Sequence, residues 1–302
     1  MRSKVRVVNT MYRLIRVSAA VFMVGVLASA LSVGIHSSAT AGDQQPELLV
    51  ETQWLDRHAE DANLRLVDMR RAEKYHEGHI PGAVNLSLSE LSSNDPVRGM
   101  AVASEEFAHI MGRLGISTNT QVLIYDDSGG LLAARLLWLL EYYGHEKVGL
   151  LNGGYPRWIT EGRKVSTLLP NISPNTFTPS TNLTRLATKE YIINSIGKEE
   201  VILIDVRSLD EYKRGHIPGA VNVEWVTGVE GEPPIFKDSQ KLQSLYHEVG
   251  ASADKEVITY CTIGVRAAHA YFQLRLLGYE RVLLYDGSWE EWGSDPDSPV
   301  EK

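Results

Sequence analysis

Residues 68–85 read DMRRAEKYHEGHIPGAVN and residues 205–222 read DVRSLDEYKRGHIPGAVN, so the chain contains closely similar segments at two places. The two copies lie 137 positions apart, and their last eight residues are identical. The similarity continues in two later pairs of segments: residues 123–148 with 258–282, and residues 150–158 with 283–292. This period is too long for a solenoid, whose units hold about 20–50 residues. The sequence therefore contains two homologous domains.

The length and composition agree with two folded domains. Of the 302 residues, 43% are hydrophobic and 23% are charged, which is typical of a folded soluble protein. We place one domain at residues 46–165 and the other at residues 185–302. Residues 166–184, which are rich in Pro, Ser, Thr and Asn, form the linker between them.

Within each copy, short apolar runs alternate with helical stretches. The runs predict buried parallel strands at residues 64–67, 122–125 and 148–151, and at residues 201–204, 257–260 and 282–285. Helices are predicted at residues 131–143 and 265–277, each closed by a glycine, Gly144 or Gly278, in the C′ position. This alternation predicts an α/β fold in which each domain is a parallel sheet flanked by helices.

The amino-terminal segment has the pattern of an export signal. Residues 1–16 carry five basic and no acidic residues, residues 17–35 carry no charge, and small residues follow up to Ala41. We interpret residues 1–41 as a secretory signal peptide and expect an exported, periplasmic protein. The alternative is that residues 17–35 remain as a membrane anchor, because the run is long enough to cross a bilayer.

The charge balance restricts the partners. The whole chain has a formal net charge of −8, and without residues 1–41 it keeps 25 basic and 38 acidic residues, a net charge of −13. A general nucleic-acid binder would need a basic surface, so we expect no nucleic-acid partner. An anionic substrate would have to be attracted by a local positive site.

The sequence contains a single cysteine, Cys261, which excludes an intramolecular disulfide and a zinc site built on several thiolates. A lone cysteine is more often a small buried hydrophobic residue than a nucleophile, so its surroundings decide. Cys261 opens a short loop between a predicted strand and a predicted helix, and backbone N–H groups in such a loop favour a thiolate. Gly264 allows the tight turn, and Arg266 adds a positive charge. These features favour a reactive thiol.

Together, these motifs resemble those of a known family. The two GHIPGAVN segments, the segments LNGGYPRW and DGSWEEW, and the loop at Cys261 make residues 46–295 similar to a tandem-domain rhodanese. Such a sulfurtransferase has an inactive amino-terminal copy and an active carboxy-terminal copy. The resemblance implies that the Cys261 thiolate takes the outer sulfur of thiosulfate as a persulfide and passes it to cyanide or a thiol.

The resemblance also implies roles for the residues around Cys261. The loop N–H groups would hold the persulfide, and Arg266 and Arg207 would hold the departing oxyanion. Trp289 matches a family position near the active loop, where it either lines the pocket or packs. The expected binding residues are Arg266, Arg207, Thr262, Ile263, Gly264, Val265 and Trp289.

The first copy has Asp126 where the second has Cys261, and its loop is one residue longer. A carboxylate cannot form a persulfide, so we expect the first domain to be catalytically silent. The alternative is that Asp126 itself acts as an acid or base.

Departures from the family pattern bear on the sulfur donor. Thiosulfate-specific members often carry basic residues directly after the cysteine, where this chain has Thr262 and Ile263. Members that use 3-mercaptopyruvate usually show Gly-Ser-Gly-Val-Thr there, and they carry a second arginine where this chain has Glu211. Because a carboxylate would repel an organic acid, we favour thiosulfate, with Arg266 replacing the missing cations.

Several alternatives stay open from the sequence. The enzyme could use 3-mercaptopyruvate, or the protein could carry persulfide to a partner with little turnover. We expect a monomer with no cofactor and no metal. The histidines of the repeated segments, His79 and His216, are interpreted as structural hydrogen-bonding residues, although His76 and His79 together could suggest a metal pair. Asp68 and Asp205 are expected to fix the neighbouring loops.

Overall fold

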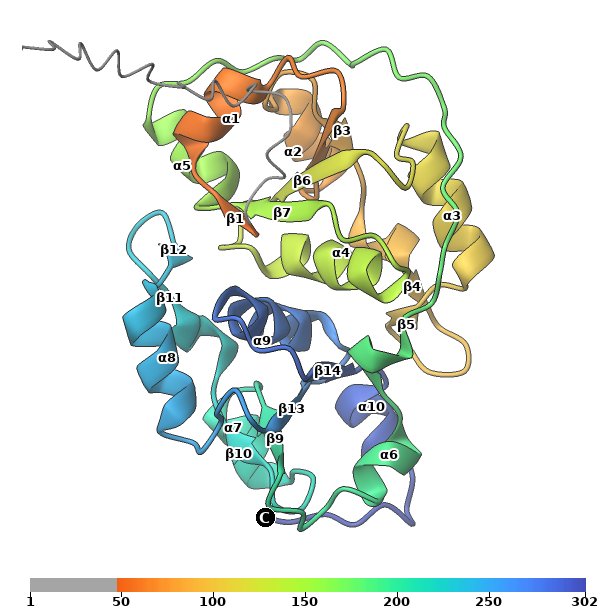
Figure 1. Ribbon diagram of the computed structural model, residues 1–302, viewed down its shortest axis with the longest axis vertical. Coiled ribbons are helices and arrows are strands. Elements are labelled where there is room, and N and C mark those ends of the chain that lie inside the picture. Colours follow the sequence, from red (N-terminus) through yellow and green to blue (C-terminus); the bar gives the residue numbers. More distant parts are fainter. Residues whose placement is uncertain (1–47) are drawn as a thin grey trace, which may run out of the picture. The chain divides into compact units, whose positions relative to one another are not determined.

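The computed structural model of the protein describes residues 48–302 (Figure 1). The interpretation of residues 1–41 as a signal peptide or anchor lies outside these residues. Within residues 48–302, no helix has both the length and the hydropathy needed to cross a membrane. The two repeats belong to one compact unit.

The first repeat is built on a parallel sheet with the strand order β1-β7-β6-β2-β3 (Figure 1). Its strands are β1 (Leu49–Val50), β2 (Leu64–Asp68), β3 (Val84–Asn85), β6 (Gln121–Tyr125) and β7 (Val148–Leu151). Its helices are α1 (Thr52–His58), α2 (Ala72–Glu77), α3 (Ser104–Arg113), α4 (Leu131–Tyr142) and α5 (Gly154–Thr160). A separate hairpin joins β4 (Ser92–Ser93) to β5 (Met100–Ala101).

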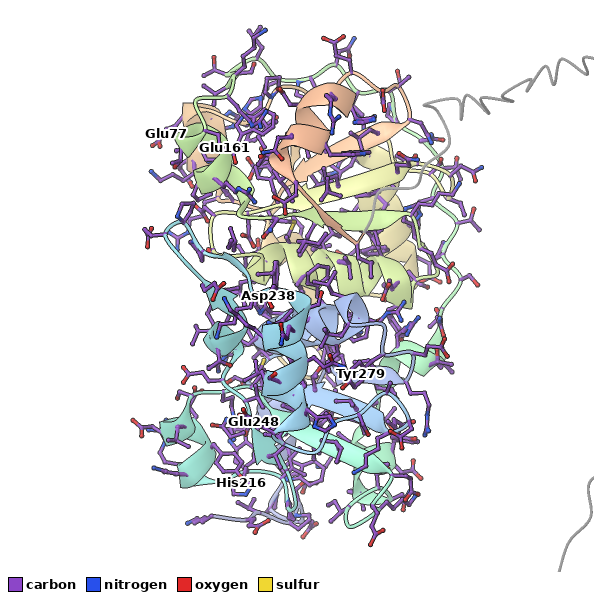
Figure 2. All side chains as sticks on the ribbon, turned by 60° about the vertical axis from the view of Figure 1, so that its left-hand side comes forward. Glu77, Glu161, His216, Asp238, Glu248 and Tyr279 are labelled. Atoms are coloured by element: carbon purple, nitrogen blue, oxygen red, sulfur yellow. The ribbon has the colours of Figure 1, made fainter. Side chains whose placement is uncertain are left out.

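The second repeat has the matching parallel sheet, in the order β10-β9-β13-β14-β8. Its strands are β8 (Leu186–Ala187), β9 (Val201–Asp205), β10 (Val221–Asn222), β13 (Glu256–Tyr260) and β14 (Val282–Tyr285). Its helices are α6 (Lys189–Ile193), α7 (Leu209–Arg214), α8 (Ser239–His247), α9 (Val265–Leu276) and α10 (Ser288–Trp292), and its hairpin joins β11 (Val229–Glu230) to β12 (Ile235–Phe236). Asp238 caps the start of α8 by accepting a hydrogen bond from the Lys241 N–H, and Glu248 follows the end of that helix (Figure 2).

The predicted α/β fold is confirmed, and the six predicted strands agree with the central strands of the two sheets to within one residue at either end. The strands β1, β3, β8 and β10 were missed, because two residues are too short to show a periodic pattern. The helices α4 and α9 end one residue earlier than predicted. Gly144 and Gly278 follow their cap residues with φ of 82° each, as the C′ position requires.

The helices α4 and α9 pack against each other between the two repeats. Each helix is buried on the side of its own sheet and on the side of the other repeat, so most of its residues are buried. One hydrophobic cluster therefore contains residues of both repeats, including Trp138 of α4 and Phe272 of α9. This shared core brings the carboxyl-end loops of the two sheets next to the other repeat.

Each hairpin contacts the loop before the central helix of the other repeat. A Cβ atom added to Gly99, in the β4–β5 hairpin, would lie 2.7 Å from the Ile263 Cβ. In the opposite direction, a Cβ atom added to Gly129 would lie 3.3 Å from the Pro234 Cγ, in the β11–β12 hairpin. A small residue thus faces a large one in both places. The first repeat therefore contacts the loop that begins at Cys261, at Ile263.

Candidate active site

Cys261 directly follows β13, which lies between β9 and β14 in the second sheet. The loop ends at Gly264, whose φ of 80° places it in the left-handed region that favours glycine. Helix α9 begins at the next residue. The thiol therefore lies where ligands of parallel α/β sheets are usually bound, at the carboxyl end of a strand and the start of a helix.

The first residues of α10 form hydrogen bonds with the backbone of the Cys261 loop. The Cys261 N–H donates to the Ser288 Oγ at 3.2 Å, and the Cys261 carbonyl accepts from the Trp289 N–H at 2.9 Å. Ser288 has φ of 51°, and its hydroxyl donates to the Tyr285 carbonyl. A non-glycine residue in this conformation is strained, which is common beside functional loops. The sequence reasoning missed Ser288, and only its position after β14 could have indicated it.

The equivalent loop of the first repeat shows what this backbone can bind. The Asp126 Oδ1 accepts hydrogen bonds from the N–H groups of Ser128 and Gly130, both at 2.9 Å. Its Oδ2 accepts from the N–H groups of Leu132, at 2.7 Å, and Ala133, at 3.0 Å. Burial raises the pKa of Asp126, and these four hydrogen bonds oppose that increase. The loop and the first turn of the helix therefore form a site for an anionic group.

In the second repeat, Cys261 occupies the position of Asp126 and its side chain is only 1% exposed. A thiol is too small to reach the N–H groups that a carboxylate bridges. The N–H groups of this shorter loop and of the start of α9 are thus available to a charged persulfide or to the oxygens of a donor. The geometry suits a nucleophilic cysteine whose charged intermediates are held by backbone N–H groups.

Arg266 lies beside this loop, as expected, and its positive charge is paired with a carboxylate. Its guanidinium pairs with Glu211 through two hydrogen bonds, of 2.8 and 2.9 Å, and also donates to the Thr262 Oγ1 at 2.7 Å. The hydrogen bonds from Arg266 hold the pKa of Glu211 far below its usual range. The expected repulsion of organic acids by Glu211 is therefore weakened, because Arg266, which was expected to replace the missing cations of the loop, balances the Glu211 charge.

Arg207, expected to hold the departing oxyanion, is engaged elsewhere. Its guanidinium is buried, donates to both Asp205 carboxylate oxygens at 2.6–3.0 Å, and also donates to the Gly215 carbonyl. The Trp289 ring covers the Arg207 guanidinium, with 4.3 Å between the guanidinium carbon and the ring centroid. The first repeat contains the same arrangement with Arg70 and its partners, so this cluster stabilises the fold of both repeats.

Two residues near the loop were missed because they are distant in sequence. Arg135, on α4 of the first repeat, is fully buried and donates to the Asp286 Oδ1 at 2.6 Å. Asp286 follows β14 and lies so close to the loop that a Cβ atom on Gly264 would be 2.7 Å from its Oδ1. No sequence signal could pair these residues, which are 151 positions apart.

The repeated histidines act as predicted. His79 Nδ1 bonds to the Tyr75 carbonyl at 2.9 Å, and His216 Nδ1 bonds to the Tyr212 carbonyl at 3.0 Å. Each ring also stacks on that tyrosine. Both histidines therefore stabilise the turn that follows α2 or α7.

The fold, the duplication and the cysteine loop define a tandem-domain sulfurtransferase of the rhodanese type. The family description "Rhodanese-like domain" matches residues 51–161 and residues 188–295, and the chain belongs to this family.

Similar proteins cover nearly the whole of both repeats. A sulfur carrier protein, TtuD, of Thermus thermophilus is 36% identical, with 86% of this chain and 99% of the relative covered. A thiosulfate sulfurtransferase of Azotobacter vinelandii is 34% identical, with 84% and 97% covered. The solved structure of the 3-mercaptopyruvate sulfotransferase SseA of Escherichia coli is 29% identical, with a TM-score of 0.74 and with 80% of this chain and 99% of that chain covered. These relatives support a general sulfurtransferase function.

Proposed function

We propose that the protein transfers the sulfane sulfur of thiosulfate to a thiophilic acceptor through a Cys261 persulfide. The observation that carries this proposal is the Asp126 carboxylate, which accepts four hydrogen bonds in the silent loop. The equivalent loop holds the chain's one thiol in place of that carboxylate. An anion formed on the Cys261 sulfur would find the same kind of N–H groups.

The transfer takes place in two half-reactions. The Cys261 thiolate attacks the outer sulfur of thiosulfate, a new S–S bond forms, and the bond to the sulfite sulfur breaks. Sulfite leaves with the electron pair of that bond. Cyanide or a thiolate then attacks the outer sulfur of the persulfide and releases the Cys261 thiolate. Because the sequence has no second cysteine, the acceptor must come from outside the chain.

The donor is proposed from the size of the site and its charge. Arg266 forms an ion pair with Glu211, and Arg135 forms one with Asp286. Both carboxylates are therefore paired, and neither opposes the binding of a dianion. Cys261 is almost completely buried, which favours a small donor. These features fit thiosulfate, and the Glu211→Gln variant should lower the KM for thiosulfate by freeing Arg266.

Mass spectrometry of the intact protein tests the proposal directly. Thiosulfate should add one sulfur to the native protein and none to Cys261→Ser, and cyanide should remove it again. A free thiol that gains no sulfur would contradict the proposal. The ratio of kcat/KM for thiosulfate to that for 3-mercaptopyruvate then decides the donor, and a higher value for 3-mercaptopyruvate would assign the protein to that alternative.

A second candidate function is favoured by the similarity to the sulfur carrier protein of Thermus thermophilus. In that case Cys261 would load with sulfur stoichiometrically but turn over slowly with small acceptors. Single-turnover loading compared with steady-state turnover separates the two functions. Fast loading with slow release to cyanide and small thiols would favour the carrier.

We also propose export to the periplasm, on the basis of the pattern in residues 1–41. Cell fractionation with mass determination of the mature amino terminus tests this, and an intact terminus in the membrane fraction would favour the anchor. We expect a monomer, because α4 and α9 are already covered by each other within one chain. Light scattering during size-exclusion chromatography measures this.

A further inference from the structure

The first repeat provides a charged residue directly behind the catalytic loop. The Arg135 Nη1 donates to the Asp286 Oδ1 at 2.6 Å, and its Nη2 donates to the Gly99 carbonyl at 3.0 Å. The Asp286 Oδ2 also accepts from the Ala101 N–H at 2.7 Å. A Cβ atom added to Gly264 would lie 2.7 Å from Asp286 and 2.8 Å from Arg135. The ion pair therefore packs against the turn that ends the Cys261 loop.

The pair matters because of its burial. The side chains of Arg135 and Asp286 are 0% and 3% exposed, so water cannot screen either charge. Without Arg135, the Asp286 carboxylate would be an unpaired negative charge beside a loop that must hold anions. Such a charge would oppose both the thiolate and an anionic donor.

The equivalent positions beside the Asp126 loop carry no such charges. Arg135 is the fifth residue of α4, and the fifth residue of α9 is His269. Asp286 follows β14, and Asn152 follows β7 in the same way. Burial lowers the pKa of His269 to about 4, so it is neutral at physiological pH. Asn152 accepts from the Phe236 N–H at 3.1 Å, as Asp286 accepts from Ala101. Only the loop with the thiol is backed by a buried ion pair.

We propose that Arg135 of the silent repeat is a positioning residue for Cys261. It balances the charge of Asp286 and holds Asp286 and Gly99 against the catalytic loop. The catalytic role of this arrangement rests on the proposed sulfurtransferase function. The silent repeat is then a required part of the active site, although it carries no nucleophile.

The test uses Cys261 as its own charge probe. Iodoacetate and iodoacetamide alkylate the same thiol, but only iodoacetate is negatively charged. Their rate ratio is measured by mass spectrometry of the full chain, which has no other cysteine. Arg135→Met should lower the iodoacetate-to-iodoacetamide ratio at least about threefold, and Asp286→Asn should raise it by a similar factor. The double variant should return close to the native ratio, and Arg135→Lys should keep it.

Asn152→Ala provides the matched control, because it removes the equivalent contact beside the silent loop. It should leave the ratio unchanged even if the melting temperature falls. Equal effects of Arg135→Met on both reagents would indicate a purely structural role and overturn the proposal. If Arg135→Met does not fold, an unchanged ratio in Asp286→Asn overturns it independently.

The same proteins separate this inference from the proposed function. Arg135→Met should raise the KM for thiosulfate more than it lowers kcat, since the donor is a dianion. A shifted alkylation ratio in a protein that takes no sulfur from thiosulfate would uphold the charge balance by Arg135 and reject the proposed function. An unchanged ratio in a protein that does take sulfur would reject the positioning role alone.

Discussion

The loops at Asp126 and Cys261 lie at equivalent places in the two repeats, but the first loop is one residue longer and begins with a carboxylate instead of a thiol. Each follows a central strand, and each ends at a left-handed glycine, Gly130 with φ of 90° or Gly264 with φ of 80°. In the first repeat the Asp126 carboxylate satisfies the loop N–H groups itself. In the second repeat a thiol takes its place. We therefore expect the first residue of such a loop to determine whether its N–H groups bond to a side chain of the protein or can bind a substrate.

The largest effect should come from removing the thiol. Cys261→Ser should reduce sulfur transfer by more than about a thousandfold, because a hydroxyl is not a nucleophile towards sulfane sulfur under these conditions. Steady-state formation of thiocyanate measures the activity, and circular dichroism checks the fold. Activity close to the native level in a folded variant would mean that the two loops do not differ in the way described.

Arg135 and His269 occupy equivalent positions on α4 and α9, but only the histidine should make the stability of the protein depend on pH. The pKa of His269 falls to about 4 by burial, from about 6.5 when unfolded, so the folded protein keeps the neutral ring. Its contribution to stability is present above pH 6.5 and is lost as the pH falls towards 4. Between pH 6.5 and pH 4 the free energy of unfolding should therefore fall by about 3 kcal/mol because of this ring.

His269→Gln should therefore flatten the dependence of unfolding free energy on pH between about 6.5 and 4. Urea denaturation across this range measures it, with Arg135→Lys as the control at the equivalent position. An identical slope in the native protein and His269→Gln would show that the buried ring is not what makes the protein sensitive to acid.

Removing the Asp126 carboxylate should lower the stability of the protein by an intermediate amount. Asp126→Ala leaves four N–H groups without their carboxylate and should lower the free energy of unfolding by about 2 kcal/mol at neutral pH. Sulfate should recover part of this loss in the variant but not in the native protein, because an anion can then enter the loop. Sulfur transfer at Cys261 should stay within about twofold of the native rate. A variant that sulfate does not stabilise would argue against an anion site in this loop.

The smallest effect is expected at the edge of the β4–β5 hairpin. The Arg98 side chain is 61% exposed and pairs with Glu290 of the other repeat at 3.0 Å. Solvent screens such a pair, so Arg98→Ala should lower Tm by less than about 2 °C. The same substitution at Arg113, whose pair with Glu90 stays within the first repeat, is the control. A much larger loss at Arg98 alone would show that this contact determines how the hairpin packs against the loop at Ile263.

The central elements could be predicted because burial imposes a strong pattern. The six central strands consist mainly of apolar residues, and Gly144 and Gly278 follow their helices in the left-handed region, which glycine enters more easily than other residues. The site was predicted only where it is local in sequence, as in the loop from Cys261 to Gly264. Arg207 and Arg266 were recognised as nearby cations, but their partners were not.

The duplication, the α/β class of each repeat and the copy that carries the thiol could all be predicted from local sequence. Those features follow from local sequence patterns and from the differences between the two repeats. Only the tertiary structure decided which charges are balanced, because an ion pair depends on the side chains that packing brings together. The packing of α4 against α9 places Arg135 beside Asp286, 151 positions away. Through this packing, the first repeat contacts the loop at Cys261, and the sequence of neither helix indicates that contact.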